Sequence, residues 1–142
     1  MGFIFKSQPL PQDINHPKWG MLAYDRDSES FRCTHFRYPF LLSLGSNQTI
    51  QDGLLDYMEK LGARLNDVEK HVELGKSKML AESPRHSGEI SSLRIDDLLL
   101  SNYKGKYFLC LIGLIGDDPD GEGRAWRYEY KDFEPIGIGF DS

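Results

Sequence analysis

The sequence predicts an α+β fold in which a mainly antiparallel, twisted sheet of about six to eight strands carries one amphipathic helix on one face. Three observations lead to this prediction. Apolar and polar residues alternate in short segments along the chain, as they do in half-buried strands. Residues 49–65 have helical spacing instead, and no period of about 20–50 residues repeats. A chain of 142 residues suits one domain, so we expect residues 1–142 to form a single domain.

The first 20 residues are expected to be irregular, because Pro9, Pro11 and Pro17 each remove a backbone donor. Phe3 and Phe5 alternate with their neighbours, which allows a short edge strand at 3–5. A polar turn at 25–29 then separates two strand-like segments and indicates a hairpin. The strands expected in this part are 21–24, 31–36 and 40–44.

The clearest single element is a helix at about 49–65. Candidate N-capping residues precede it, and the acidic residues lead while the basic residues follow, which suits the helix dipole. The apolar positions recur every three or four residues, so they form one stripe that would cover the sheet: Ile50, Leu54, Met58, Leu61 and Leu65.

The remainder of the chain reads as further strands. Residues 71–82 are expected to be a strand with a bend at Gly75, followed by a loop at 83–88 and another apolar segment at 90–100. The continuous apolar run 107–115 is typical of a central strand covered on both faces. A long turn follows at 116–123, then a half-buried strand at 126–130 and a last edge strand at 136–140. Since one helix covers only one face, the other face is either open to water or a binding surface.

Charge and composition limit the function classes. The chain is 39% hydrophobic and 27% charged, which is typical of a folded globular protein. Its net charge of -5 disfavours nucleic-acid binding, which needs clustered Lys and Arg. The first residues lack a signal peptide and a myristoylation pattern, and no apolar run reaches the roughly 20 residues that span a bilayer. We therefore expect a cytoplasmic protein without membrane contact.

The residue types that carry catalysis do not form a recognisable constellation. His16, His35, His71 and His86 lack metal-ligand spacing, and Cys33 and His35 have no third orienting group. Cys33 and Cys110 are expected to be packed, reduced thiols, although a disulfide between them stays open. No glycine-rich phosphate loop is present. The sequence therefore predicts no enzyme activity, no cofactor and no metal centre.

One acidic loop resembles a calcium site in spacing alone. Asp118, Asp120, Glu122, Gly123 and Glu129 fall at positions 1, 3, 5, 6 and 12 of an EF-hand-like loop. Strand-like flanks and a glutamate at position 5 depart from that pattern, so a solvated turn is favoured. Calcium binding in another geometry stays open.

The charge distribution points to a partner. Residues 96–142 contain 10 acidic and 5 basic residues, whereas the first 95 residues are neutral. Acidic residues interleaved with Trp and Tyr suit capture of a basic protein, because carboxylates steer the encounter and aromatic rings anchor it. The predicted partner-binding residues are Asp117, Asp118, Asp120, Glu122, Trp126, Tyr128, Glu129, Asp132 and Glu134.

These features predict a protein-binding module, in particular a bacterial inhibitor of the immunity type. It would neutralise a basic, nuclease-like toxin domain by occluding its active site. Two alternatives stay open. The chain could be an adaptor or subunit of a larger assembly that docks through a sheet edge at 136–140 or 3–5. It could also be a small-ligand-binding or enzymatic α+β domain.

Overall fold

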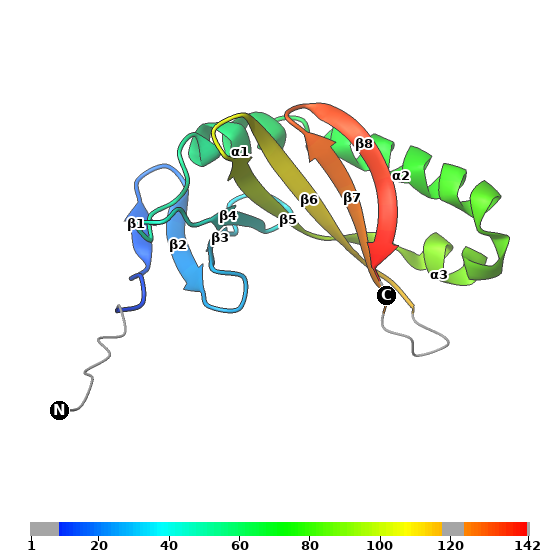
Figure 1. Ribbon diagram of the computed structural model, residues 1–142, viewed down its shortest axis with the longest axis horizontal. Coiled ribbons are helices and arrows are strands. Elements are labelled where there is room, and N and C mark those ends of the chain that lie inside the picture. Colours follow the sequence, from blue (N-terminus) through cyan, green and yellow to red (C-terminus); the bar gives the residue numbers. More distant parts are fainter. Residues whose placement is uncertain (1–8, 118–123, 142) are drawn as a thin grey trace.

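The computed structural model describes residues 9–117 and 124–141. These residues form an eight-stranded sheet in which the strands lie in chain order (Figure 1). Neighbouring strands are antiparallel, except that β4 and β5 are parallel. The α+β class and the mainly antiparallel sheet are therefore confirmed. The strands are β1 (Ile14–His16), β2 (Gly20–Asp25), β3 (Ser30–Cys33), β4 (Phe40–Ser43), β5 (Arg94–Tyr103), β6 (Tyr107–Ile115), β7 (Ala125–Lys131) and β8 (Glu134–Asp141).

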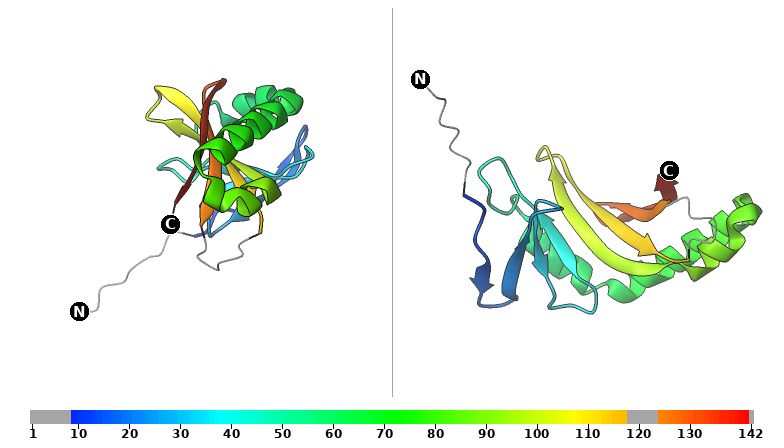
Figure 2. Two further views of the ribbon diagram at one scale, coloured as in Figure 1. Left: turned by 90° about the vertical axis from the view of Figure 1, so that its right-hand side faces the viewer. Right: turned by 90° about the horizontal axis from the view of Figure 1, so that it is seen from below.

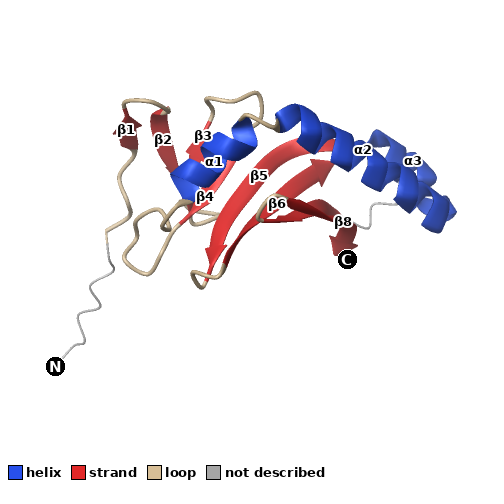
Figure 3. Ribbon diagram, turned by 90° about the horizontal axis from the view of Figure 1, so that it is seen from above, coloured by secondary structure: helices blue, strands red, loops and turns tan. Residues whose placement is uncertain are grey.

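The helices lie between β4 and β5 in the chain and run along one side of the sheet (Figure 3). This long connection explains the one parallel pair, because parallel neighbours need a crossover. The prediction of one helix is wrong, since the described residues contain three α-helices and a 3₁₀ turn. They are α1 (Leu54–Gly62), α2 (Leu65–Glu82), η1 (Pro84–His86) and α3 (Ser87–Ser92).

The helix predicted at 49–65 is real but shorter at its start. Ile50 does not join the helix, because its backbone forms an isolated bridge with Leu44. Gly53 then adopts a left-handed conformation with φ of 79° and caps α1. A side chain at this position would also meet the Phe108 ring, since a Cβ atom on Gly53 would lie 2.8 Å from it. Both constraints favour glycine and delay the start of the helix.

The strand predicted at 71–82 is wrong, because these residues belong to the long helix α2. A strand would place Val72 and Leu74 on one face, but Val72 is 2% exposed and Leu74 is 68% exposed. Val68, Val72 and Lys76 instead recur every four residues and are buried. At Gly75 the helix lies close to the sheet, where an added Cβ atom would lie 2.7 Å from the Tyr128 ring. Packing on the sheet therefore overrides the weak local pattern.

Most of the other predicted strands are confirmed within one or two residues at each end, namely 21–24, 40–44, 107–115, 126–130 and 136–140. The segment 31–36 ends early, because β3 stops at Cys33. The loop 83–88 and the segment 90–100 contain η1, α3 and the first part of β5. β1 was not expected in the proline-rich start, and the possible strand at 3–5 lies outside the described residues.

The core fills the space between the helices and one face of the sheet. Side chains of α1 and α2 pack there against alternate residues of β3 to β7, as in Leu54, Met58, Leu98 and Ile112. Strands β5 and β6 curve along their length beside these helices (Figure 2). Both cysteines are free and buried in this core. Burial raises the pKa of the Cys33 and Cys110 thiols, which keeps them in the unreactive thiol form.

Candidate functional site

The predicted aromatic anchors lie inside the protein. Trp126 is 4% exposed and Tyr128 is 5% exposed, because both rings point from β7 toward the helices. The Trp126 indole Nε1–H donates to Oε1 of the buried Glu89 at 2.9 Å. Burial also raises the pKa of the Tyr128 hydroxyl. These two rings therefore belong to the core and do not form the exposed anchors that the sequence suggested.

The predicted acidic residues are dispersed. Asp118, Asp120 and Glu122 lie outside the described residues. Asp117 is exposed at the end of β6, where its backbone N–H donates to Ser92 Oγ at 2.7 Å. Glu129 lies on the opposite face of β7 from the buried rings and pairs with Arg127 at 3.0 Å.

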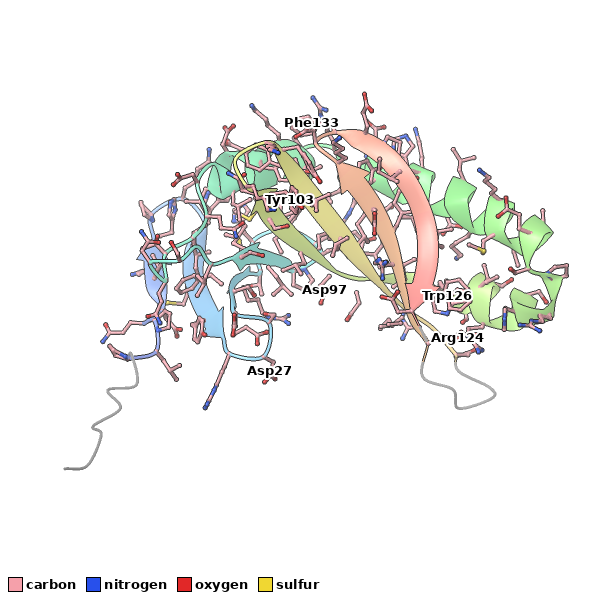
Figure 4. The ribbon with its side chains drawn as sticks, viewed as in Figure 1. Asp27, Asp97, Tyr103, Arg124, Trp126 and Phe133 are labelled. Atoms are coloured by element: carbon pink, nitrogen blue, oxygen red, sulfur yellow. The ribbon has the colours of Figure 1, made fainter. Side chains whose placement is uncertain are left out.

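Asp132 and Glu134 occupy the other end of the β6–β7–β8 region, beside Phe133. Figure 4 shows Phe133 and Arg124 at opposite ends of these strands. Asp132 has a structural role in the β7–β8 turn, because Phe108 N–H donates to its Oδ1 at 2.9 Å and the Tyr57 hydroxyl donates to its carbonyl. Glu134 is exposed. The described members of the predicted site are therefore not brought together into one surface.

The structure instead assembles a leucine row on the sheet face that the described helices leave uncovered. Strand register places Leu41 beside Leu99, and Leu99 beside Leu111. Leu109 lies two residues before Leu111 on the same face of β6. Leu41 is buried at 5% exposure and the other three leucines are half-buried, but none of the four belongs to the hydrophobic cluster between the sheet and the helices. We call Leu41, Leu99, Leu109 and Leu111 the open-face strip.

This strip gives β6 two apolar faces. Cys110, Ile112 and Leu114 are buried toward the helices, whereas Leu109 and Leu111 are half-buried on the open face. A strand that is apolar on both faces is normally covered on both faces. The sequence predicted cover on both faces of this strand. In the described part of the chain, only the face toward the helices is covered.

A half-buried carboxylate lies in the row next to the open-face strip. Asp97 follows a β-bulge on β5 and pairs with Gly113 on β6. Its carboxylate occupies the space above the glycine, because an added Cβ atom on Gly113 would lie 2.6 Å from Asp97 Oδ1. Burial raises the pKa of the Asp97 carboxyl, and the neighbouring carboxylates of Asp96 and Asp25 raise it further, although Arg32 partly opposes them. These surroundings therefore disfavour the ionised form of Asp97 relative to a free aspartate.

A cavity of about 360 Å³ opens beside this carboxylate. It lies at the end of the sheet where Asp97 and Arg124 are labelled in Figure 4. Four carboxylate-bearing residues and one basic residue line it, namely Asp96, Asp97, Asp117, Glu89 and Arg124. Since Arg124 pairs with Glu89, the three aspartates give the lining an excess of negative charge. A pocket of this composition suits a cationic group.

Three basic residues of the open face already have partners, whereas Arg94, at the exposed start of β5, lies opposite Ile115 on this face. Arg32 approaches Asp25 at 3.9 Å, and Arg127 pairs with both Glu129 and Asp141. Lys131 lies 4.5 Å from the centre of the Tyr107 ring. In the described part of the chain, Asp97 has no ion pair within 4.0 Å. The carboxylate of Asp97 therefore lies beside the leucines of this face without a direct ion pair.

A fully buried carboxylate, that of Glu89 on α3, lines the same cavity. Arg124 Nε and a terminal guanidinium nitrogen donate to Glu89 Oε2 at 3.0 and 2.6 Å. His86 Nδ1 lies 4.0 Å from the same oxygen. Because Glu89 also binds Trp126, this cluster holds the first residues of β7 against α3. Sequence reasoning missed it, since the segment at 83–88 was expected to be a loop and no spacing relates Glu89 to Arg124.

Within the described residues, no group of three or more His, Cys, Asp or Glu side chains could hold a metal ion. None of the described helices combines the length and apolarity that a membrane crossing requires. Comparison with protein-family models, with curated proteins and with solved structures finds no match.

Proposed function

We propose that this protein is a binding module that captures a basic partner protein on the open face of its sheet. The observation that carries the proposal is the open-face strip beside Asp97. An apolar centre with charged residues at its border is the usual organisation of a protein interface. A partner that covers the strip would bury the second apolar face of β6, as expected for a strand that is apolar on both faces.

The charge of the partner follows from Asp97. A lysine or arginine from the partner would stabilise the ionised carboxylate, whose present environment disfavours it. The acidic lining of the adjacent cavity, with Asp96 and Asp117, extends the same preference. Negative charge at the border of an interface also accelerates association with a basic protein.

The finer function that we propose is inhibition, as in an immunity protein that occludes the active site of a nuclease-like toxin. Enzymes that act on nucleic acids carry basic clefts, because they must bind phosphates. Leucines that fill such a cleft and carboxylates that engage its basic residues would exclude the substrate. This activity requires no catalytic group in the inhibitor.

Affinity capture from the source cells followed by work on a purified pair tests this proposal. The immobilised proteins are the wild type, Asp97→Asn, Leu111→Thr and the control Leu10→Thr, which changes an exposed leucine outside the sheet. We expect a basic protein to be retained by the wild type and the control, and lost from the other two. With the purified pair, association should slow as salt rises from about 0.1 M to about 1 M, because screening shortens the range of the charges.

The same pair separates inhibition from simple docking. An inhibitor abolishes the partner's nuclease or other enzyme activity at a one-to-one ratio, whereas an adaptor leaves it unchanged. Equal retention by the wild type, Asp97→Asn and Leu111→Thr would contradict the open face as the binding surface.

A further inference from the structure

The outer edge of β8 is a second surface that this binding role does not use. β8 is the last strand in the sheet order, so in the described part of the chain only one of its edges is paired. Its central residues 136–140 carry no charge, and Ile136 is 58% exposed. Pro135 and a β-bulge at Ile136 interrupt the start of the strand, because Glu129 pairs with Gly137 and Tyr130 with Pro135. Proteins usually block a sheet edge with lysines, bulges or a covering element, and beyond this bulge residues 137–141 contain no lysine or proline, so they can serve as a template for an added strand.

A groove runs between this edge and helix α2. It has a volume of about 340 Å³. Leu74 and Met79 line it from the helix together with the charged residues Lys78 and Glu82, and Ile136 and Ile138 line it from the strand. Leu74 is 68% exposed, which is unusual for a leucine that faces a sheet edge. The groove therefore offers apolar contacts to side chains that project from a strand added to β8.

We propose that an extended segment of a partner protein binds here as a ninth strand of the sheet. Its main chain would pair with β8, which is the usual mode of strand addition. Alternate apolar side chains would enter the groove between β8 and α2. A lysine or arginine at one end would face Glu134, whose carboxylate is exposed. This inference does not depend on the open-face strip, because it uses a different edge and different residues.

Charge argues against a second copy of this chain as the occupant. Two identical edges related by a two-fold axis must pair antiparallel. Pairing centred on β8 would then place Glu134 of one copy opposite Asp141 of the other. Like charges directly opposite in a sheet are unfavourable, whereas a basic residue at the same place would be favourable.

Two synthetic peptides of eight residues, the length of β8, test the inference. Acetylated and amidated KVTVSVTK has basic ends, and EVTVSVTE is the matched acidic control. Each is titrated into the full-length protein while backbone amide signals and light scattering are recorded. The variants are Ile136→Lys, which places a charge on the edge, and Met21→Lys, a control that is 54% exposed on β2.

We expect KVTVSVTK to shift the amides of residues 134–141 and to slow their hydrogen exchange. EVTVSVTE should bind at least tenfold more weakly. Ile136→Lys should weaken binding of KVTVSVTK at least tenfold, and Met21→Lys should bind like the wild type. Unchanged β8 amides at millimolar peptide, equal binding of the two peptides, or equal binding by Ile136→Lys would overturn the inference. A dimer of the free protein that Ile136→Lys dissociates would assign the edge to a second copy and overturn it too.

These results are independent of the proposed function. If the peptides fail to bind, the expected effects of Asp97→Asn and Leu111→Thr on capture are unchanged, because neither residue lines the groove beside β8. Conversely, loss of the open-face interaction does not alter the amide shifts of β8.

Discussion

The two faces of β7 differ in both burial and charge. Trp126, Tyr128 and Tyr130 point toward the helices and are at most 5% exposed. Arg127 and Glu129 point the other way and are about one-third exposed. Successive side chains of a strand project to opposite faces, so aromatic and acidic residues that alternate in the sequence cannot form one surface. When aromatic and acidic residues alternate along one strand, the rings and the carboxylates therefore lie on opposite faces of the sheet and cannot contact the same partner surface.

The largest effect that tests this contrast is loss of the Trp126 ring. Trp126→Ala should lower the free energy of unfolding by about 3–5 kcal/mol, because it empties a buried site and removes the indole donor from Glu89. Glu129→Ala, three residues along on the open face, should change it by less than about 1 kcal/mol. Urea unfolding of both variants measures the difference. Similar losses in the two variants would mean that both faces of β7 are covered.

The next effect concerns the charge behind β7. Glu89→Gln keeps the size of the side chain but removes the negative charge that faces the buried guanidinium of Arg124, at 2.6 Å. Removing one member of a buried ion pair is strongly destabilising, so we expect a loss of about 3 kcal/mol by urea unfolding. Glu59→Gln, which removes the exposed partner of Lys18, is the control and should cost less than about 1 kcal/mol. A small loss in Glu89→Gln would show that Arg124 is well solvated.

The sequence predicted the strands well because their signal is local. Alternation within β7 and the apolar run of β6 each lie inside one segment of the chain. Helix α2 was missed because the helical pattern of its apolar residues is weak. Its close approach to the sheet also depends on Gly75, which lies beside the Tyr128 ring, a contact between residues far apart in the sequence.

The open-face strip was missed for a different reason. Leu41 and Leu99 are neighbours only because β4 pairs with β5 in parallel, across the whole helical connection. No local pattern encodes that register. The one available signal was the apolar run at 107–115, which indicated cover on both faces and therefore pointed to a second apolar surface.

A smaller effect tests the contact between Asp97 and Gly113. Gly113→Ala would place a Cβ atom 2.6 Å from Asp97 Oδ1, so the carboxylate must move. We expect a cost of about 1–3 kcal/mol in unfolding free energy, as for other overpacked sites. In an Asp97→Ala background the same change should cost much less, because the obstructing oxygen atom is absent. Equal costs in the two backgrounds, measured as a double-mutant cycle, would show that the two residues are not coupled.

The smallest expected effect is a gain in stability, in contrast to the losses above, and it concerns the ionisation of Asp97. Its carboxyl has a raised pKa in the folded protein, above the ordinary value of 3.8, because burial and nearby carboxylates disfavour the charge. The folded state therefore holds this proton more tightly than the unfolded state, and stability decreases as pH rises from the ordinary pKa through the raised one.

Asp97→Asn removes that penalty. The variant should unfold at a higher temperature than the wild type at neutral pH, and the difference should disappear below about pH 4. Asp27→Asn, which removes one exposed carboxylate from the β2–β3 turn, is the control for loss of a negative charge. If Asp97→Asn destabilised the protein at neutral pH, the ionised carboxylate would be favourable in the isolated fold, and a basic partner would no longer be needed to explain its position.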